Sequence, residues 1–186
     1  MYVPSYALTY PLTNFVFLCN LAALLTAWAL WRGNVLLLSS QAVGLPVISV
    51  VWTIDVLSRL GTGHHLIGGT AYMWDAQLPL FTRLLSLYHV ALPVAQMIAL
   101  RRSGYDRRGY PLQAAIALAA VAAGRFCDPT ANINYAFVDP FFRREWGGAV
   151  THVALIAGAL ALVVYPLVHL ALSRLFPPPA GDTSAG

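Results

Sequence analysis

The sequence contains no lysine and few charged residues of any kind. All 11 basic residues are arginine, only 7 residues are acidic, and charged residues make up 10% of the chain, against roughly 25% in soluble domains. Hydrophobic residues make up 59% of the 186 residues, and the mean hydropathy is +0.67. A single soluble core of this size could not bury that much apolar surface, whereas a lipid bilayer can cover it. The composition therefore predicts an integral membrane protein.

Cysteine is scarce as well. Cys19 and Cys127 form no CxxC pair, which argues against thiol–disulfide chemistry of the thioredoxin type. The arginines do not form the basic face of a soluble domain that a nucleic-acid-binding protein needs, so nucleic acid is not an expected partner. Four of them lie in the short segment 101–108, which is typical of a topology signal and of contacts with lipid headgroups. The N-terminus lacks the basic region and cleavage site of a signal peptide, so we expect the first hydrophobic run to be retained.

Hydrophobic runs predict an all-α bundle of about five transmembrane helices in one domain, residues 1–176. A span needs about 20 mostly apolar residues. The candidates cover residues 12–31, 35–57, 78–100, 111–126 and 149–172. The glycine-rich stretch 58–77 interrupts this pattern, and we expect it to lie in the interface or to re-enter the membrane. Residues 177–186 are rich in proline, glycine and serine, which predicts a disordered tail.

The distribution of arginine predicts the orientation, because cytoplasmic loops carry an excess of basic residues. With five spans, six arginines fall on one side of the membrane and three on the other. The first set is Arg32, Arg101, Arg102, Arg107, Arg108 and Arg174, and the second is Arg59, Arg143 and Arg144. We therefore expect a protein of the cell membrane with its N-terminus outside and its C-terminus in the cytoplasm.

This topology gathers most ionisable side chains in the outer half of the membrane, and ionisable residues inside a membrane indicate a functional site. His89 lies about 16 Å below the outer edge at 1.5 Å per residue. We expect an outward-opening polar cavity between the second, third and fifth spans. The candidate residues are Asp55, His64, His65, Asp75, Arg83, His89, Asn132, Asn134 and His152.

His89 and Asp55 are the candidate catalytic pair. His89 would act as an acid/base or as a ligand, and Asp55 would orient it or act as a second ligand. Structural interpretations stand beside these roles. Asp55 can pair with Arg59 one helical turn away, and a neutral His89 can hydrogen-bond across helices. Arg83 can extend to lipid headgroups.

The sequence is compatible with a metal cofactor but identifies none. His64, His65 and Asp75 are candidate ligands of zinc or iron, although no HExxH or similar spacing is present. Haem is disfavoured because the histidines within the spans differ in depth by at least about seven residues, or about 10 Å. Acyl transfer through Cys127 lacks a supporting GxSxG motif.

Two classes of function are compatible with these features. The first is an enzyme that acts on a lipid or a lipid-soluble substrate at the outer polar site. The second is a non-enzymatic accessory subunit or a small oligomeric transporter, although no inverted repeat points to transport. The expected partners are membrane lipids together with a second copy of the chain or another membrane subunit.

Four segments occur in an order that resembles a group of uncharacterised small bacterial multi-pass membrane proteins. They are WTIDVLSRLGTGHHLIGGTAYMWD, LFTRLLSLYHVALPV, GYDRRGY and NINYAF, and the resemblance covers roughly residues 50–170. In that group the last motif reads as an acidic residue followed by N-I-N-W-x-F. Here Ala131 stands in place of the acid and Tyr135 in place of the tryptophan, so an activity that needed this acid would be lost. The resemblance implies a shared architecture and no known activity.

Overall fold

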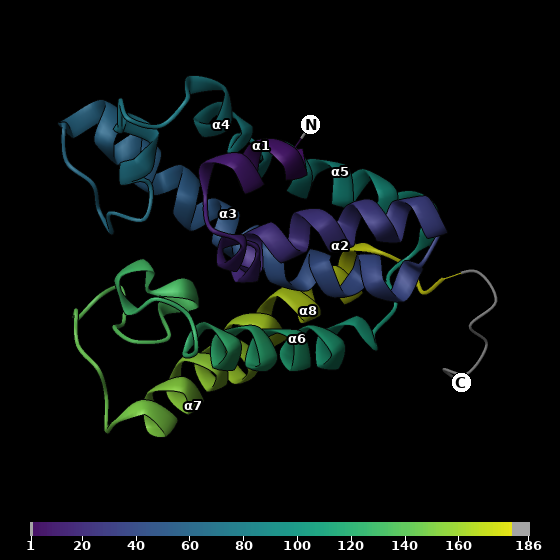
Figure 1. Cartoon of the computed structure of the whole chain (residues 1–186). Coiled ribbons are helices and arrows are strands. Elements are labelled where there is room, and N and C mark those ends of the chain that lie inside the picture. The colour runs from purple at the N-terminus through teal and green to yellow at the C-terminus, as the bar shows by residue number, and fades with distance from the viewer. Residues whose placement is uncertain (1, 180–186) are drawn as a thin grey trace.

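The computed structural model describes residues 2–179, and all of their regular secondary structure is helical. The long helices run alongside one another, with α3 in the middle (Figure 1). The elements are α1 (Tyr2–Thr9), η1 (Leu12–Val16), α2 (Leu18–Arg32), α3 (Val35–Thr62), η2 (Ala71–Trp74), α4 (Leu80–Leu85), α5 (Tyr88–Ser103), α6 (Gly109–Gly124), η3 (Pro129–Ala131), η4 (Ile133–Tyr135), α7 (Ala149–Ala159), the π-helical turn η5 (Leu160–Val164) and α8 (Tyr165–Leu175).

Among the described residues, three helical stretches are long and apolar enough to cross a bilayer. They are α3, the stretch Leu80–Ser103 formed by α4 and α5, and the stretch Ala149–Leu175 formed by α7, η5 and α8. These correspond to the second, third and fifth predicted spans. The helices α2 and α6 are apolar but shorter, with 15 and 16 residues. The all-helical fold class is thus confirmed, and the composition of the long helices is that of a membrane protein.

The central helix α3 is defined at both ends by local sequence. Asn34 caps its start, because the side-chain oxygen accepts a hydrogen bond from the N–H of Leu37 at 2.9 Å. Gly63 ends it with a positive φ of 76°, a conformation that glycine adopts without strain. Between these ends α3 packs against α2, α5 and α6. It is therefore the helix around which the bundle is built.

Close approach of α6 to α3 depends on glycine. A Cβ atom at Gly44 would lie 2.2 Å from Gln113 Nε2, and one at Gly109 would lie 2.8 Å from the Ser39 side chain. Gln41 and Gln113, both buried, join the two helices by a hydrogen bond of 3.3 Å. The contact between α3 and α6 is thus both closely packed and polar.

Three boundaries differ from those predicted. The first span is not one helix, because Phe17 is extended (φ −55°, ψ 131°) between η1 and α2. The helix α3 continues to Thr62, through the start of the stretch that was predicted to break the pattern. The third span is interrupted between α4 and α5, where the Ser86 carbonyl accepts both the backbone N–H (3.1 Å) and the imidazole Nδ1 (2.9 Å) of His89.

The two long connections lie at the same end of the bundle (Figure 1). We call residues 63–79 the first loop and residues 125–148 the second loop. The short turns 33–34 and 104–108 lie at the opposite end. There the Tyr105 N–H donates to the Pro177 carbonyl at 2.8 Å, so the predicted tail begins against the 104–108 turn. Residues 180–186 of that tail lie outside the described residues.

Candidate functional site

Asp55 anchors the first loop to the end of α3. The side chain is 1% exposed. Its Oδ1 accepts hydrogen bonds from the N–H groups of Ile67 (2.7 Å) and Gly68 (3.2 Å). Its Oδ2 accepts from the N–H (3.0 Å) and the hydroxyl (2.5 Å) of Thr70. A buried carboxylate with four such donors is fully satisfied, and it folds the glycine-rich segment back over the helix.

Thr70 links Asp55 to His65 and determines the tautomer of the imidazole. The Thr70 hydroxyl donates its only proton to Asp55, so towards His65 Nδ1, 3.1 Å away, it can only accept. A neutral His65 therefore carries its proton on Nδ1, which also lies 3.4 Å from Asp55 Oδ2. Its Nε2 is the unprotonated nitrogen, and it forms no hydrogen bond within residues 2–179.

The His65 ring is held in place but remains accessible. The Trp74 indole packs against it edge-on, with ring centroids 5.2 Å apart and an interplanar angle of 79°. The Arg59 guanidinium lies over the Trp74 ring, with its Cζ 5.9 Å from the ring centroid. The His65 side chain is 20% exposed. A substrate could therefore reach an imidazole whose orientation is already fixed.

His89 lies in a different environment, inside the bundle on α5. It is 4% exposed and is stacked between Trp52 (centroids 4.8 Å apart, 5°) and Tyr88 (4.3 Å, 24°). Its Nδ1 donates to the Ser86 carbonyl at 2.9 Å. No hydrogen bond joins His89 to Asp55 in the part of the chain that the structure describes. The orienting group of His89 is thus a backbone carbonyl, and not the predicted carboxylate.

The other candidates from this region lie apart from one another. His64 is exposed, and Asp75 accepts a hydrogen bond from a backbone N–H two residues further on. Arg83 Nη1 donates to the Met73 carbonyl at 2.9 Å and ties α4 to η2. No three His, Cys, Asp or Glu side chains between residues 2 and 179 come close enough to hold a metal ion. The structure therefore does not bring His64, His65 and Asp75 together as a metal centre.

Asn132 organises the second loop. Its Oδ1 accepts from the N–H groups of Phe137 (3.0 Å) and Val138 (3.1 Å), and its Nδ2 donates to the Val138 carbonyl at 2.8 Å. Its φ of 42° lies in the left-handed region, which asparagine tolerates better than most residues. Asn132 thus uses its side-chain oxygen and one of its two side-chain N–H groups to shape the backbone of the second loop.

Asn134 connects the second loop to two helices. Its Oδ1 accepts from the Leu18 N–H at 2.8 Å, at the start of α2. Its Nδ2 donates to the carbonyls of Val16 (2.9 Å) and Ala120 (3.1 Å). The side chain therefore supplies the acceptor that the first turn of α2 lacks, and it explains why α2 begins at Leu18.

His152, at the start of α7, is also committed to backbone contacts. It is fully buried, its Nδ1 accepts from the Trp146 N–H at 3.2 Å, and its Nε2 lies 3.0 Å from the Tyr135 carbonyl. Because Nδ1 is an acceptor, Nε2 must carry the proton and donate it to that carbonyl. His152 thus fastens the second loop to α7.

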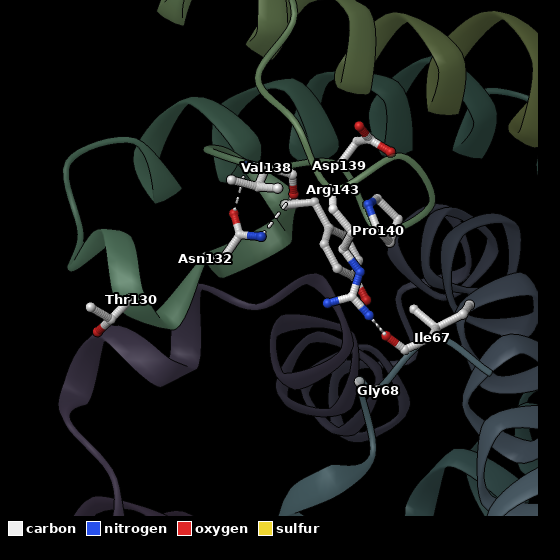
Figure 2. Close-up of a pocket in the computed structure, with 10 residues that line it drawn as sticks. Ile67, Gly68, Thr130, Asn132, Val138, Asp139, Pro140 and Arg143 are labelled. Carbon is white, nitrogen blue, oxygen red and sulfur yellow. Dashed lines mark hydrogen bonds between the residues drawn. The ribbon is translucent and has the colours of Figure 1, made fainter. Parts of the chain in front are cut away.

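A cavity of about 330 Å³ lies between the two loops (Figure 2). Arg143 crosses it, and its Nη2 donates to the Ile67 carbonyl at 2.6 Å. On the other side, a Cβ atom at Gly69 would lie 3.3 Å from the Tyr135 hydroxyl. Burial, followed by the nearby Asp55 charge, raises the pKa of Tyr135, so its hydroxyl stays protonated. The lining residues are Ile67, Gly68, Gly69, Thr130, Asn132, Tyr135, Val138, Asp139, Pro140 and Arg143.

Three residues at this end escaped the sequence reasoning. Arg143 entered it only as a topological charge, Tyr135 only as a departure from a motif, and Thr70 not at all. The Gly-Gly-Thr sequence at 68–70 suggests a tight backbone turn. However, no local pattern indicates that this turn closes on a carboxylate 15 positions earlier.

Comparisons with protein-family models, with curated proteins and with solved structures find no match for this chain. The fold and the site therefore define only a class: over residues 2–179, a helical bundle with three helices of membrane-spanning length and two interacting loops at one end. The function proposed for this chain is based on the polar side chains of these two loops.

Proposed function

We propose that this chain is an integral membrane enzyme that acts on a lipid or lipid-soluble substrate at the loop end of the bundle. The observation that carries the proposal is the series of contacts from Asp55 through Thr70 to His65. A general base needs an unprotonated nitrogen within reach of its substrate, and the Nε2 of a His65 side chain that is 20% exposed supports this role. A carboxylate behind the imidazole stabilises the imidazolium that forms when the base takes a proton.

The roles of the three residues follow from their contacts. His65 would accept a proton from a water molecule or a substrate hydroxyl. Thr70 holds the imidazole with Nδ1 towards the carboxylate, and Asp55 supplies the compensating negative charge. His65 thus takes the role of base that the sequence reasoning gave to His89, while Asp55 keeps the role of orienting residue.

We also propose five spans, with the loop end of the bundle and the N-terminus outside the cell. The helices α2 and α6 support this number, because both are apolar and pack directly against α3. At 1.5 Å per residue, α6 is about 24 Å long, against about 30 Å for the hydrocarbon core. Local thinning of the bilayer accommodates a mismatch of this size. The six-to-three distribution of arginine supports the orientation.

Cysteine labelling tests the orientation. The variant Ser103→Cys, made in a chain with Cys19→Ser and Cys127→Ser, places one thiol beside the 104–108 turn. A membrane-impermeant maleimide should leave it unlabelled in intact cells and label it after lysis. Labelling in intact cells would invert the topology and place the loop end in the cytoplasm.

Turnover of membrane lipids tests the activity. The purified protein is placed in nanodiscs prepared from the total membrane lipids of the cells that produce it, and lipid species are followed by mass spectrometry. We expect a species to be consumed by the wild type, and this turnover to be lost in His65→Gln. The control is His64→Gln, because His64 is the exposed neighbour outside the hydrogen-bonded series. Equal turnover in His65→Gln and wild type would refute the assignment of the base.

One observation favours a non-enzymatic alternative, an accessory subunit or a small oligomeric transporter. Only 11% of the most apolar part of Ala149–Leu175 is buried within the chain. Gly158 on this helix has no atom within 4 Å of an added Cβ, so a second helix could approach closely there. Disulfide cross-linking of Gly158→Cys in membranes, together with unchanged lipids in the nanodisc assay, would favour this alternative.

A further inference from the structure

The cavity between the loops contains polar groups whose hydrogen-bonding capacity is unused. Arg143 uses Nη2 for the Ile67 carbonyl, while Nη1 and Nε have no partner within residues 2–179. Figure 2 shows the second terminal nitrogen directed into the open space between Asn132 and Gly68. The Tyr135 hydroxyl and the Gly69 N–H likewise form no hydrogen bond in the described part of the chain. The guanidinium and the Gly69 N–H are hydrogen-bond donors, and the Tyr135 hydroxyl can donate as well.

The side-chain amide and carboxylate acceptors that line the same cavity are already occupied. Asn132 Oδ1 accepts two backbone N–H groups. Asp139 is 5% exposed, its Oδ1 accepts from the two residues that follow Pro140, and its Oδ2 accepts from the Trp146 indole at 2.8 Å. Burial alone would raise the pKa of Asp139, but these hydrogen bonds hold this pKa below its usual value. The carboxylate is therefore ionised, but it makes no ion pair with Arg143.

Backbone strain falls on the same two side chains. Four non-glycine residues in the described chain have positive φ, and two of them are asparagines. The other two are Tyr135 (φ 58°) and Arg143 (φ 56°), for which this conformation is unfavourable. Such strain occurs preferentially where a side chain must be aimed at a ligand. Here it directs the two free side-chain donors into one cavity.

We infer that this cavity binds a phosphate-type oxyanion, in the setting of the proposed function the phosphate of a lipid headgroup. Arg143 supplies the charge and planar donors that phosphate favours, and Tyr135 and Gly69 supply neutral donors beside it. A volume of about 330 Å³ is larger than a bare phosphate needs and falls at the lower end of small-ligand pockets. The inference rests on the proposed function only for the source of the phosphate, and the donor set itself is independent of it.

The assay is lipid binding to the purified full-length chain, measured by native mass spectrometry and by competition in detergent. The probes are phosphatidic acid, diacylglycerol with the same acyl chains, and inorganic phosphate. We expect binding of phosphatidic acid that diacylglycerol does not compete away. Binding of inorganic phosphate without binding of phosphatidic acid would show that the site takes a free anion. That result would keep the oxyanion site and exclude a lipid headgroup as the source of the phosphate.

Four variants locate the binding. Tyr135→Phe should weaken phosphatidic acid binding by about three- to ten-fold, as loss of one neutral hydrogen bond implies, without a change in melting temperature. Arg143→Gln should weaken it by about ten-fold or more, and Arg143→Lys by less, because the charge is kept. Arg144→Gln is the matched control, since Arg144 stacks on Trp146 and does not line the cavity.

Two results would overturn the inference. One is equal binding of phosphatidic acid and diacylglycerol, and the other is unchanged binding in both Tyr135→Phe and Arg143→Gln. The variant His65→Gln separates this site from the proposed catalytic base, because it should bind phosphatidic acid as the wild type does. In His65→Gln, loss of turnover with intact binding of phosphatidic acid would support both proposals. In the wild type, binding without turnover would refute only the proposal of an enzyme.

Discussion

Replacement of Asp55 by asparagine should release the first loop from α3 without unfolding the bundle. The amide keeps one oxygen for Ile67 and Gly68, but places an N–H₂ group against the Thr70 N–H. The variant loses two charge-assisted hydrogen bonds, which contribute about 1.5–3 kcal/mol each. The Thr70 hydroxyl can rotate and accept from the new amide, and this neutral hydrogen bond offsets part of the loss. The net cost is therefore about 2–4 kcal/mol, concentrated on the first loop.

Hydrogen exchange measures this release directly, because Asp55 is the acceptor for the amides of Ile67, Gly68 and Thr70. A loop whose opening becomes 2–4 kcal/mol easier should exchange about 30- to 1,000-fold faster at these amides. The amides of α6, remote from the loop, provide the internal reference and should keep their wild-type rates.

The matched variant is Thr70→Val, which keeps the backbone amide and removes the hydroxyl. It should give a smaller acceleration, because Asp55 retains three of its four donors. Rapid exchange of the three amides in the wild type, or identical exchange in wild type and Asp55→Asn, would refute the view that this carboxylate holds the loop.

Three further predictions concern the bundle. Asn134→Ala removes three hydrogen bonds, so we expect the melting temperature to fall by roughly 5–10 °C, whereas Ser103→Ala, at the opposite end, should change it little. Gly109→Ala should lower the free energy of unfolding by about 1–3 kcal/mol, because its Cβ would lie 2.8 Å from backbone atoms of Ser39 and Ser40; a wild-type value would contradict this packing. The Arg108 guanidinium holds the pKa of Asp106 below its ordinary value of 3.8, so the stability advantage over Asp106→Asn should persist above that pH and disappear as acid titrates the folded carboxylate.

The positions of the long helices could be predicted because each depends on its own residues. Apolar runs of about 20 residues indicated α3, α4 with α5, and α7 with α8. The break at Phe17 could not be predicted, because its cause is the side-chain oxygen of Asn134, which accepts from the N–H of Leu18, 116 positions away. The hydropathy of 12–31 is compatible with one uninterrupted helix, and only the tertiary hydrogen bond selects the split form.

The candidate site shows the same limit. The sequence located Asp55 and His65 at one end of the bundle, and the structure places them 3.4 Å apart. It paired Asp55 with His89 instead, because the predicted topology places both in one polar cavity between neighbouring spans. The actual pairing depends on how the segment 67–70 folds back, with Gly68 at a φ of 88°. Backbone conformations of this kind arise from several simultaneous contacts, and a one-dimensional pattern does not encode them.

A polar residue inside a membrane protein is costly, and this cost alone does not distinguish a structural role from a chemical one. Asp55, Asn134 and His152 bear this cost while they satisfy backbone groups, and they thereby fasten the two loops to the helices of the bundle. Function is expected where hydrogen-bonding capacity remains unused after the fold is complete. At the loop end that capacity remains on His65 Nε2 and on the Arg143 guanidinium. The proposal of chemistry on a lipid headgroup rests on these two groups, a proton acceptor and a cationic donor on two loops that a hydrogen bond joins.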